Sequence, residues 1–541
     1  MINNKVIYVE DHIDAKGSDD AAGIRAAIHK AIEVNAEIVV FEPREYILRT
    51  SQTIQTEGFA HDAGSSDETW KECHIPIRGA KRLTLQGSVD ENGEPATVLV
   101  GFNDLQVNPY LPAILWCEDC DHLQVRNLAF TREPEFASAG IVVSNDGNQI
   151  SVEVFQGNPC YDNMGTYCMN RLHPDTGALI GESVTYGAGA GCLWRLQGER
   201  RLLLNSSDVA SKVQVGECLS WHQGAQTDFQ MYFSRCDDLA LNNIRTFNSN
   251  GFCILTENCH GIAADRVIFR PKGKQLFTGP RDAWKIYKCS GNIEIRRMIV
   301  EGVRMDGQNL HHNWLVLKQI TKPNEAVFFC KYSYAPLAAG SRIQLYREDE
   351  SESYRIVESS RVRKADGGNE YRVVFDRDLA QDLREGTLGT ASCWKASRYI
   401  CKDSEFVNIA GAGHLVRYDH LYIINCKYRN TMNPGILLGA ELPVHSEGGH
   451  ASDILIKDCE FDNCGFFPRY GARGCIGIKS HGFKGKFNKN IIIANNTMKN
   501  SDIGIHAVDA DQVYLIENRF EKIDVPLLQD DPTVGRIWNH G

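Results

Sequence analysis

Two aspartates, Asp282 and Asp306, have a side-chain type and a spacing that could form an acid–base pair. They are separated by 24 residues. An alternating apolar pattern between them predicts one strand and a turn. Its members are Ile293, Ile295, Met298 and Val300. If the chain coils with a repeat close to this spacing, the two aspartates share one face, one turn of the coil apart.

Stacked carboxylates would support hydrolytic chemistry. Neighbouring strands lie about 4.8 Å apart, so the two charges would repel and one carboxyl would keep its proton at neutral pH. Glycoside hydrolysis uses such a pair, about 5–5.5 Å apart for retention and about 6.5–9.5 Å for inversion, and splayed turns fit either range. The alternative is that both aspartates are ordinary turn residues, since Gly307 follows Asp306.

The elements that would position this pair begin with an N-terminal cap. Ser18, Asp19 and Asp20 are N-cap candidates for an amphipathic helix, which two short strands at 38–41 and 46–48 follow. The apolar face of the helix contains Ile24, Ala27, Ile28, Ala31 and Ile32. A coil of strands exposes an apolar end, and we expect this helix to cover it.

A short template with apolar residues at its first, third, sixth and eighth positions then recurs. Copies start at Leu123, Leu239, Ile262, Ile293, Leu421, Ile454, Ile491 and Val513. The shortest interval is 22 residues, from Ile491 to Val513, and the others vary in length. Fixed strands with variable loops are typical of a parallel β-helix, whereas the consensus of a leucine-rich repeat is absent.

Polar residues precede the second apolar pair of several copies. They include Asn425, Asp458, Asn495 and Glu517, and in the last two copies Asn496 and Asn518 replace an apolar residue. Asparagine tolerates the left-handed conformation and can hydrogen-bond a stacked copy of itself. We therefore predict a ladder of stacked turns.

Two intervals, 131–238 and 314–396, lack the template and contain short strands with turn signals. The predicted fold is all-β: a right-handed parallel β-helix with an N-terminal capping helix and two inserted small β-barrel or sandwich modules. The predicted domains are 1–130 (cap and first coils), 131–238 (inserted β module), 239–313 (central coils with the site), 314–396 (inserted β-barrel) and 397–541 (C-terminal coils).

Composition narrows the classes of partner. The net charge is −11 with no basic block, which argues against nucleic acid and anionic membranes and favours a neutral ligand. No apolar run is long enough to span a membrane, and no signal-peptide pattern is visible in the sequence, so we expect a cytoplasmic protein or the mature form of an exported bacterial one. Oligomeric state stays open.

The 18 cysteines are scattered. Cys117 and Cys120 form an isolated CxxC pair without a second half, so a zinc site is not expected. Others lie in or next to apolar strand patterns, namely Cys289, Cys401, Cys426 and Cys459, and buried free thiols are the better interpretation. No metal or cofactor is predicted.

The segment from Arg281 to Trp314 resembles the core of glycoside hydrolase family 110. That family's pattern is an aspartate, a Cys-x-Gly turn, a strand and an Asp-Asp-x-x-Asn-x-His cluster. The matching residues here are Asp282, Cys289 to Gly291, Asp306, Asn309 and His311. A second stretch, 433–449, resembles another part of the family and contains Glu447.

The resemblance implies a β-helix exo-acting glycoside hydrolase that removes terminal α-1,3-linked galactose from a neutral oligosaccharide or polysaccharide with inversion. It implies that Asp282 is the acid and Asp306 the base, with Glu447 as a helper or substrate ligand. Asn309 and His311 would bind sugar hydroxyls, although a structural histidine is an equal alternative. Trp284, on the same strand face as Asp282, would stack on a sugar ring or pack in the core.

One departure leaves the function open. The first aspartate of the family's Asp-Asp pair is Met305 here. Asp306 must then act alone or with Glu447, or the chain is a carbohydrate-binding β-helix without catalysis. A polysaccharide lyase or epimerase on the same fold is a third hypothesis, and the net negative charge of the protein argues against it.

Overall fold

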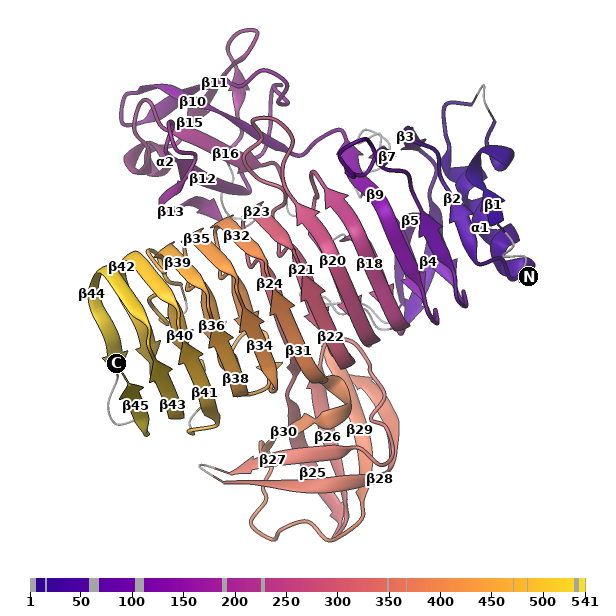
Figure 1. Ribbon diagram of the computed structural model, residues 1–541, viewed down its shortest axis with the longest axis vertical. Helices are drawn as coiled ribbons and strands as arrows, with labels where there is room; N and C mark the ends of the chain where they lie inside the picture. The colour runs from indigo at the N-terminus through magenta and orange to yellow at the C-terminus, as the bar shows by residue number, and fades with distance from the viewer. Residues whose placement is uncertain are drawn as a thin grey trace.

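The computed structural model describes residues 6–14, 17–57, 68–102, 111–186, 192–224, 229–347, 350–365, 367–469, 471–483, 485–529 and 535–540. Its main body is a coil of parallel strands with three faces, here named A, B and C, which runs from the N-terminal to the C-terminal end in Figure 1. Each turn of the coil passes through faces C, A and B in that order.

Face A contains β1 (Val6–Tyr8), β2 (Ile38–Val40), β6 (Thr84–Gln86), the first halves of β9 (Gln124–Glu133), β18 (Asp237–Thr246) and β20 (His260–Phe269), then β22 (Ser290–Arg296), β31 (Ala396–Lys402), β34 (Leu421–Ile424), β38 (Ser452–Lys457), β41 (Asn488–Ala494), β43 (Ala510–Ile516) and β45 (Ile537–His540).

Face B contains β3 (Glu45–Leu48), β7 (Thr97–Phe102), the second halves of β9, β18 and β20, then β23 (Ile299–Val303), β32 (Glu405–Ile409), β35 (Lys427–Thr431), β39 (Glu460–Cys464), and the first halves of β42 (Thr497–Ala507) and β44 (Arg519–Gln529).

Face C contains β5 (Glu68–Arg78), β8 (Ala113–Glu118), β17 (Phe229–Ser234), β19 (Phe252–Glu257), β21 (Trp284–Tyr287), β24 (Gln308–Asn313), β33 (His414–Val416), β36 (Ile436–Leu438), β40 (Ile476–Ile478) and the second halves of β42 and β44. Two short antiparallel strands join it: β4 (Gln52–Glu57) pairs with β5, and β37 (Glu447–Gly448) pairs with β24.

The strand register confirms the repeat. On face A the predicted starts of successive copies are direct partners: Leu239 opposes Ile262, Ile262 opposes Ile293, Leu421 opposes Ile454, and Ile454 opposes Ile491, which in turn opposes Val513. Tyr399 fills the position between Ile293 and Leu421, a copy that the template missed. The residues at these positions are buried in one core that runs the length of the coil.

The turn ladder is confirmed as well. The predicted positions Asn425, Asp458, Asn495 and Glu517 all have φ between 51° and 56°, the left-handed conformation. At the C-terminal end, Asn496 Nδ2 donates to Asn518 Oδ1 at 3.0 Å, one coil further on. Stacked polar turns therefore fix the strand register at the C-terminal end of the coil, where Asn496 and Asn518 replace apolar residues.

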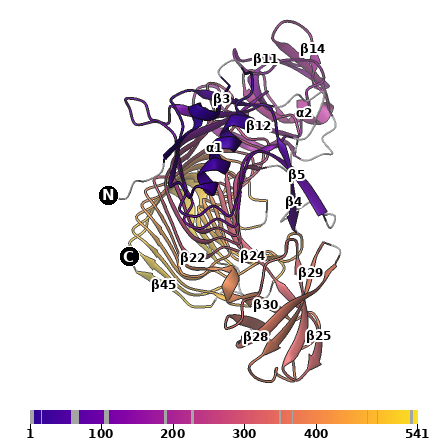
Figure 2. The ribbon, with the colours of Figure 1, turned by 90° about the vertical axis from the view of Figure 1, so that its right-hand side faces the viewer.

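Helix α1 (Ala21–Glu33) covers the N-terminal end of the coil, as predicted. Ile24, Ala27, Ile28 and Ala31 are buried against the same core, and Figure 2, which looks along the coil, shows the helix lying across its near end. Asp20 is the N-cap residue of the helix, and the preceding Asp19 accepts a hydrogen bond at Oδ1 from the Ala21 N–H at 3.1 Å. The predicted buried thiols at 289, 401, 426 and 459 are buried and unpaired.

Two β modules interrupt the coil. The first is a seven-stranded antiparallel sheet with a short helix, α2 (Ser207–Lys212). In sheet order its strands are β13 (Leu179–Tyr186), β12 (Cys168–Leu172), β16 (Cys218–His222), β10 (Ala137–Asn145), β11 (Gln149–Val154), β15 (Arg201–Asn205) and β14 (Arg195–Leu196). The coil continues in β9 as far as Glu133 and resumes in β17 at Phe229, ahead of the predicted resumption at 239.

The second module is a closed six-stranded barrel with its own core. In barrel order its strands are β25 (Leu315–Lys322), β26 (Glu325–Lys331), β29 (Gly368–Phe375), β28 (Glu350–Ala365), β27 (Arg342–Arg347) and β30 (Leu388–Ala391). The fold class is thus confirmed: a parallel β-helix with a capping helix and two inserted β modules.

The two modules stand on the same side of the coil in Figure 2, one above and one below. The first module contacts the turns that lead into face C. For example, Arg304 Nη1, in the turn after β23, donates to Asn170 Oδ1 of β12 at 2.9 Å. The barrel begins at Leu315, directly after the face C strand β24. Face C is therefore bordered along both of its edges at this level of the coil.

Within the described residues, no helix has the length and apolar character to cross a membrane.

Candidate functional site

The register of face C brings Asp282 and Asp306 together. Trp284 of β21 opposes Gln308 of β24, so the two aspartates occupy the same turn position in successive coils. The Asp306 N–H donates to Asp282 Oδ1 at 3.2 Å. Both side chains are buried, with 3% and 7% of their surface exposed. The coil repeat thus produces the stacking that the 24-residue spacing suggested.

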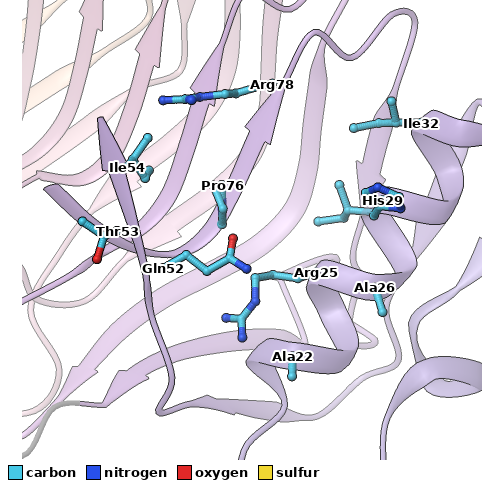
Figure 3. Close-up of a pocket in the computed structure, with 11 residues that line it drawn as sticks. Ala22, Arg25, Ala26, His29, Ile32, Gln52, Thr53, Ile54, Pro76 and Arg78 are labelled. Atoms are coloured by element: carbon cyan, nitrogen blue, oxygen red, sulfur yellow. The ribbon is translucent and has the colours of Figure 1, made fainter. Parts of the chain in front are cut away.

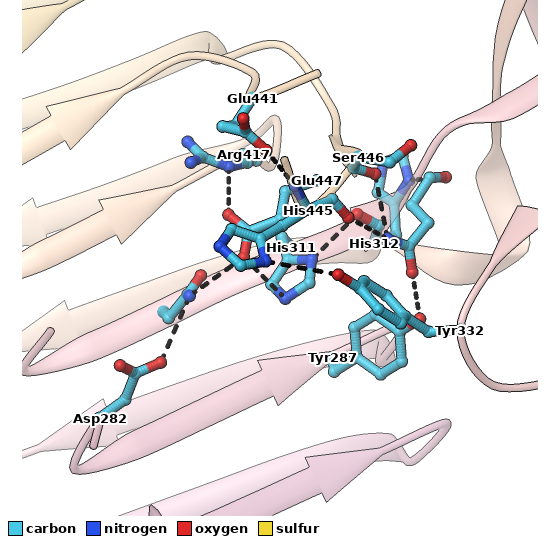
Figure 4. A network of polar contacts seen from close by, with 12 residues as sticks. Asp282, Tyr287, His311, His312, Tyr332, Arg417, Glu441, His445, Ser446 and Glu447 are labelled. Carbon is cyan, nitrogen blue, oxygen red and sulfur yellow. Dashed lines mark hydrogen bonds and ion pairs between the residues drawn. The ribbon is translucent and has the colours of Figure 1, made fainter. Parts of the chain in front are cut away.

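Glu447 joins this pair from a distant part of the sequence. It lies on β37, and Asn313 of β24 is its direct strand partner. Asn309 Nδ2 is 3.3 Å from Asp282 Oδ2 and 3.5 Å from Glu447 Oε1, so it bridges the two carboxylates. Figure 4 labels Asp282 and Glu447. Because both contacts are made by the same nitrogen, the two carboxylate oxygens lie no more than about 7 Å apart.

Arg417 anchors Glu447 from the other side. Its Nε donates to Glu447 Oε2 at 2.8 Å, and its Nη1 donates to the Gly439 carbonyl. His311 Nε2 lies 3.5 Å from Glu447 Oε1. The structure therefore brings together five of the six predicted site residues: Asp282, Asp306, Asn309, His311 and Glu447.

Trp284 is the exception, and its predicted contact with sugar is wrong. Its side chain points into the coil, is fully buried in the central core, and donates from Nε1 to Thr256 Oγ1 at 3.3 Å. Side chains alternate between the two faces of a strand, and the outward position next to it belongs to Lys285. Core packing, the alternative for this residue, is what the structure has.

The buried aspartates hold a proton at neutral pH. Burial and the neighbouring Asp282 charge raise the pKa of Asp306 to about 8, and burial also raises the pKa of Asp282. Both Asp282 oxygens accept hydrogen bonds. Of the Asp306 oxygens, Oδ1 accepts from the Ala412 N–H at 2.7 Å. The pair therefore carries one proton between them, with Asp306 as its favoured holder.

Glu447 is the ionised member of the group. Burial opposes its ionisation, but His311, Arg417 and Lys285 outweigh burial and hold its pKa well below the usual range. Burial lowers the pKa of His311 to about 3, so this ring is neutral at pH 7 and the attraction there comes from Arg417 and Lys285. A neutral acid and ionised carboxylates thus coexist within one site.

Two buried acceptors at this site have no hydrogen-bond partner in the described part of the chain. One is Asn309 Oδ1, and the other is His311 Nε2. The His311 Nδ1 contact is with the His312 carbonyl at 3.0 Å, so Nδ1 carries the proton in the neutral ring and Nε2 is an acceptor. Buried acceptors without donors are costly, and a ligand hydroxyl would satisfy each of them.

The pocket in front of these side chains is narrow. Its lining consists of Arg281, Asp282, Lys285, Met305, Asp306, Asn309, Leu415, Arg417, Glu441, His445 and Glu447. Its volume of about 30 Å³ accommodates a water molecule rather than a sugar ring. Met305, Arg281, Lys285 and His445 are only partly buried, so a sugar would enter by displacing these side chains.

The sequence did not single out several of these residues, above all Arg417 and Glu441. Arg417 follows β33 and occupies the same position of its coil as His311. The template would have found it only if the coils had been aligned across the barrel insertion. No group of three or more histidine, cysteine, aspartate or glutamate side chains in the described residues is arranged to hold a metal ion.

A larger hollow of about 820 Å³ lies at the capped end, between α1 and the strands β4 and β5 (Figure 3). Its lining consists of Ala22, Arg25, Ala26, Ile28, His29, Ile32, Gln52, Thr53, Ile54, Pro76 and Arg78. None of the described residues that line it is a carboxylate, and Arg25 is already hydrogen-bonded to the Thr50 and His74 carbonyls. Size therefore does not identify the reactive site, and the carboxylate cluster on face C is the stronger candidate.

Several solved structures align with nearly the whole chain, among them an exopolygalacturonase and a mannuronan epimerase module. An exopolygalacturonase from Thermotoga maritima aligns with a TM-score of 0.47 at 10% identity, over 99% of this chain and 91% of that one. The A-module of a mannuronan C-5 epimerase from Azotobacter vinelandii aligns with a TM-score of 0.38 at 10% identity, over 99% and 98%. The fold is assigned here from the strand pairing itself.

No family profile matches the chain. It is 22% identical over 312 residues to the α-1,3-galactosidase A of Bacteroides fragilis, 56% of this chain and 48% of that protein. It is 24% identical over 251 residues to the α-1,3-galactosidase B of Phocaeicola vulgatus, 43% of this chain and 41% of that protein. The chain spans about half the length of these relatives or less. They confirm the resemblance that the two motif segments predicted.

Proposed function

We propose that this protein is an exo-acting glycoside hydrolase that removes a terminal α-galactosyl residue from a neutral saccharide. The observation that carries the proposal is the buried, proton-sharing pair Asp282–Asp306, linked through Asn309 to the ionised Glu447. The relatives named α-1,3-galactosidases support the sugar and the linkage.

The electrostatics favour a division of roles different from the one expected from the resemblance. Asp306, which keeps a proton at neutral pH, protonates the leaving oxygen. Asp282, the ionised partner, accepts a proton from the attacking water. Met305 does not compete for this role, since a thioether neither donates nor accepts a proton.

Glu447 then acts as a ligand for the sugar rather than as the base. Its pairing with Arg417 holds its pKa low, and a weakly basic carboxylate is a poor acceptor of a water proton. It is well suited to accept hydrogen bonds from sugar hydroxyls. The unsatisfied acceptors Asn309 Oδ1 and His311 Nε2 favour the same kind of ligand, one rich in hydroxyl donors.

The walls of the site support an exo mode. The segment 441–447 crosses the pocket on one side, and the barrel begins beside it at the end of β24. A pocket closed in this way accepts the end of a saccharide chain rather than its middle. The acceptor-rich lining and the overall negative charge favour a neutral chain.

A non-catalytic carbohydrate-binding protein is the second candidate, and the narrow pocket with Met305 at its rim favours it. A lyase or epimerase ranks third. Arg281, Lys285 and Arg417 line the pocket and could neutralise a uronate, although Arg417 is paired with Glu447. A lyase would release an unsaturated product that absorbs in the near ultraviolet.

The decisive experiment is a screen of nitrophenyl glycosides and α-1,3-galactosides, with Asp306→Asn and Asp282→Asn as test variants. We expect release of galactose by the wild-type protein and at least a hundredfold loss in each variant. Nuclear magnetic resonance of the first anomer released measures the stereochemistry, for which the resemblance implies inversion. Turnover that survives both substitutions would refute the site assignment, and saccharide binding without product would favour the second candidate.

A further inference from the structure

Asn313, the last residue of β24, is fully buried and makes hydrogen bonds in three directions. Its Nδ2 donates to the His445 carbonyl at 3.2 Å and to the Ser446 carbonyl at 3.0 Å. Its Oδ1 accepts a hydrogen bond from the Tyr287 hydroxyl. The two carbonyls belong to the residues directly before Glu447. Asn313 thus connects residues 445 and 446, which lead into Glu447, with two adjacent coils of face C, those of β21 and β24.

The barrel holds the same segment from the outside. Lys331, the last residue of β26, donates from Nζ to the Val444 carbonyl, and the Tyr332 hydroxyl lies 3.3 Å from His445 Nδ1 (Figure 4). Within the segment, the buried Glu441 carboxylate accepts from the Val444 N–H at 2.8 Å and the His445 N–H at 2.7 Å.

These contacts explain how a short two-residue strand can place a carboxylate precisely. The pairing of β37 with β24 involves only two residue pairs, which is too little to fix a strand by itself. An asparagine side chain that bonds two successive carbonyls adds a constraint on the backbone, beside the Arg417 ion pair that holds the Glu447 carboxylate. The barrel adds an exposed contact from Lys331 and a part-buried one from Tyr332 to the pocket-lining His445.

We propose that Asn313 is a positioning residue that fixes Glu447 for substrate binding, and that the barrel, through Lys331 and Tyr332, stabilises the same segment. The inference rests on the proposed function, because it takes Glu447 to be a ligand of the substrate. Asn313 itself contacts neither Asp282 nor Asp306 through any hydrogen bond of the described residues. Its effect on activity therefore passes through Glu447.

The test compares Asn313→Leu, which is close in size but forms no side-chain hydrogen bonds, with Asn292→Leu, an exposed position of β22. We expect a rise in KM of about tenfold to hundredfold for Asn313→Leu with a smaller change in kcat, since the two hydrogen bonds to the 445 and 446 carbonyls and the one from Tyr287 are lost. The Asn292→Leu control should match the wild type. Tyr332→Phe, a milder change, should raise KM in the same direction but less.

A double variant separates positioning from general stability. If Asn313 acts through Glu447, adding Asn313→Leu to Glu447→Gln should cost little more than Glu447→Gln alone. If the fold-losses of Asn313→Leu and Glu447→Gln instead multiply in the double variant, the two residues act independently and the inference is overturned.

Amide hydrogen exchange provides a readout that does not depend on activity. Asn313→Leu should speed exchange at residues 444–448 while leaving β22 and β31 unchanged. If the wild type hydrolyses no galactoside, the proposed function fails, and the exchange data still decide the positioning. Unchanged exchange at 444–448 would refute it.

Discussion

Asp306→Asn should make the protein more stable while it abolishes turnover. In the unfolded chain an aspartate has a pKa of about 3.9, whereas burial and the Asp282 charge raise the folded value to about 8. At pH 7 the unfolded carboxyl is ionised and the folded one is protonated, so folding must take up a proton. The pH is then about 3 units above the pKa of the unfolded carboxyl. Proton uptake therefore costs about 4 kcal/mol, and asparagine avoids it.

The sign of the pH dependence follows from the raised folded pKa. The contribution of Asp306 to stability is fully present below the unfolded pKa, near pH 4, and is lost as pH rises toward 8. The wild type and Asp306→Asn should therefore be equally stable near pH 4, and the variant should lead by about 4 kcal/mol at pH 7. The Asn side chain keeps the oxygen that accepts the Ala412 N–H, so the turn itself is preserved.

The assay is thermal or urea denaturation of both proteins at several pH values between 4 and 8. Asp265→Asn is the matched control, because Asp265 is a partly exposed carboxylate paired with Arg297 and its pKa is lowered, chiefly by the Arg297 hydrogen bond. The control should show no gain in stability. The reasoning is refuted if Asp306→Asn is no more stable than the wild type at pH 7, or if its gain is the same at pH 4.

Four further outcomes are expected. The kcat/KM of the wild type should fall about tenfold per pH unit above pH 8, as Asp306 loses its proton; a flat profile from pH 7 to 10 would argue against Asp306 as the acid. Glu447→Gln should raise KM about tenfold to hundredfold, because charge-assisted hydrogen bonds to the sugar are lost; unchanged saccharide binding in calorimetry would exclude Glu447 as a ligand. Burial lowers the pKa of His450 to about 3, so its contribution to stability is present above pH 6.5 and is lost as pH falls, by about 2 kcal/mol at pH 5; His450→Phe should reduce the fall in melting temperature between pH 7 and pH 5, and an equal fall would contradict this. Ile24→Ala, on the buried face of α1, should cost about 2–4 kcal/mol in denaturant unfolding, whereas a cost below 1 kcal/mol would mean that the helix does not seal the coil.

Much of the fold could be predicted from the sequence because its determinants are local. Apolar alternation marks the strands, and polar residues with left-handed backbone mark the turns, as at Asn425 and Asp458. The copy at Tyr399 was missed because it follows the barrel insertion directly, where the run of intervals between copies is broken. The first module's extent was also misjudged, since β17 has no template and its strand role depends on pairing with β8 and β19.

The candidate site shows where sequence reasoning ends. Asp282 and Asp306 could be paired in advance because they lie one uninterrupted coil apart, so their spacing and the repeat together fix their stacking. Trp284 was placed wrongly because strand alternation alone does not say which set of side chains faces the core; both Trp284 and Lys285 fit an outward position until the packing is known.

The sequence by itself determined the coil, its cap, the existence of two insertions and the pair of stacked aspartates. Only the tertiary structure decided that Arg417 lies beside that pair and that Glu447, which the family resemblance had placed at the site, reaches it through Asn309. The inserted barrel separates these segments in the sequence, so the coil repeat cannot be counted across it. The tertiary structure also decided which carboxyl holds the proton. Ionisation depends on burial and on charges a few ångströms away, and those distances exist only once the coils have stacked.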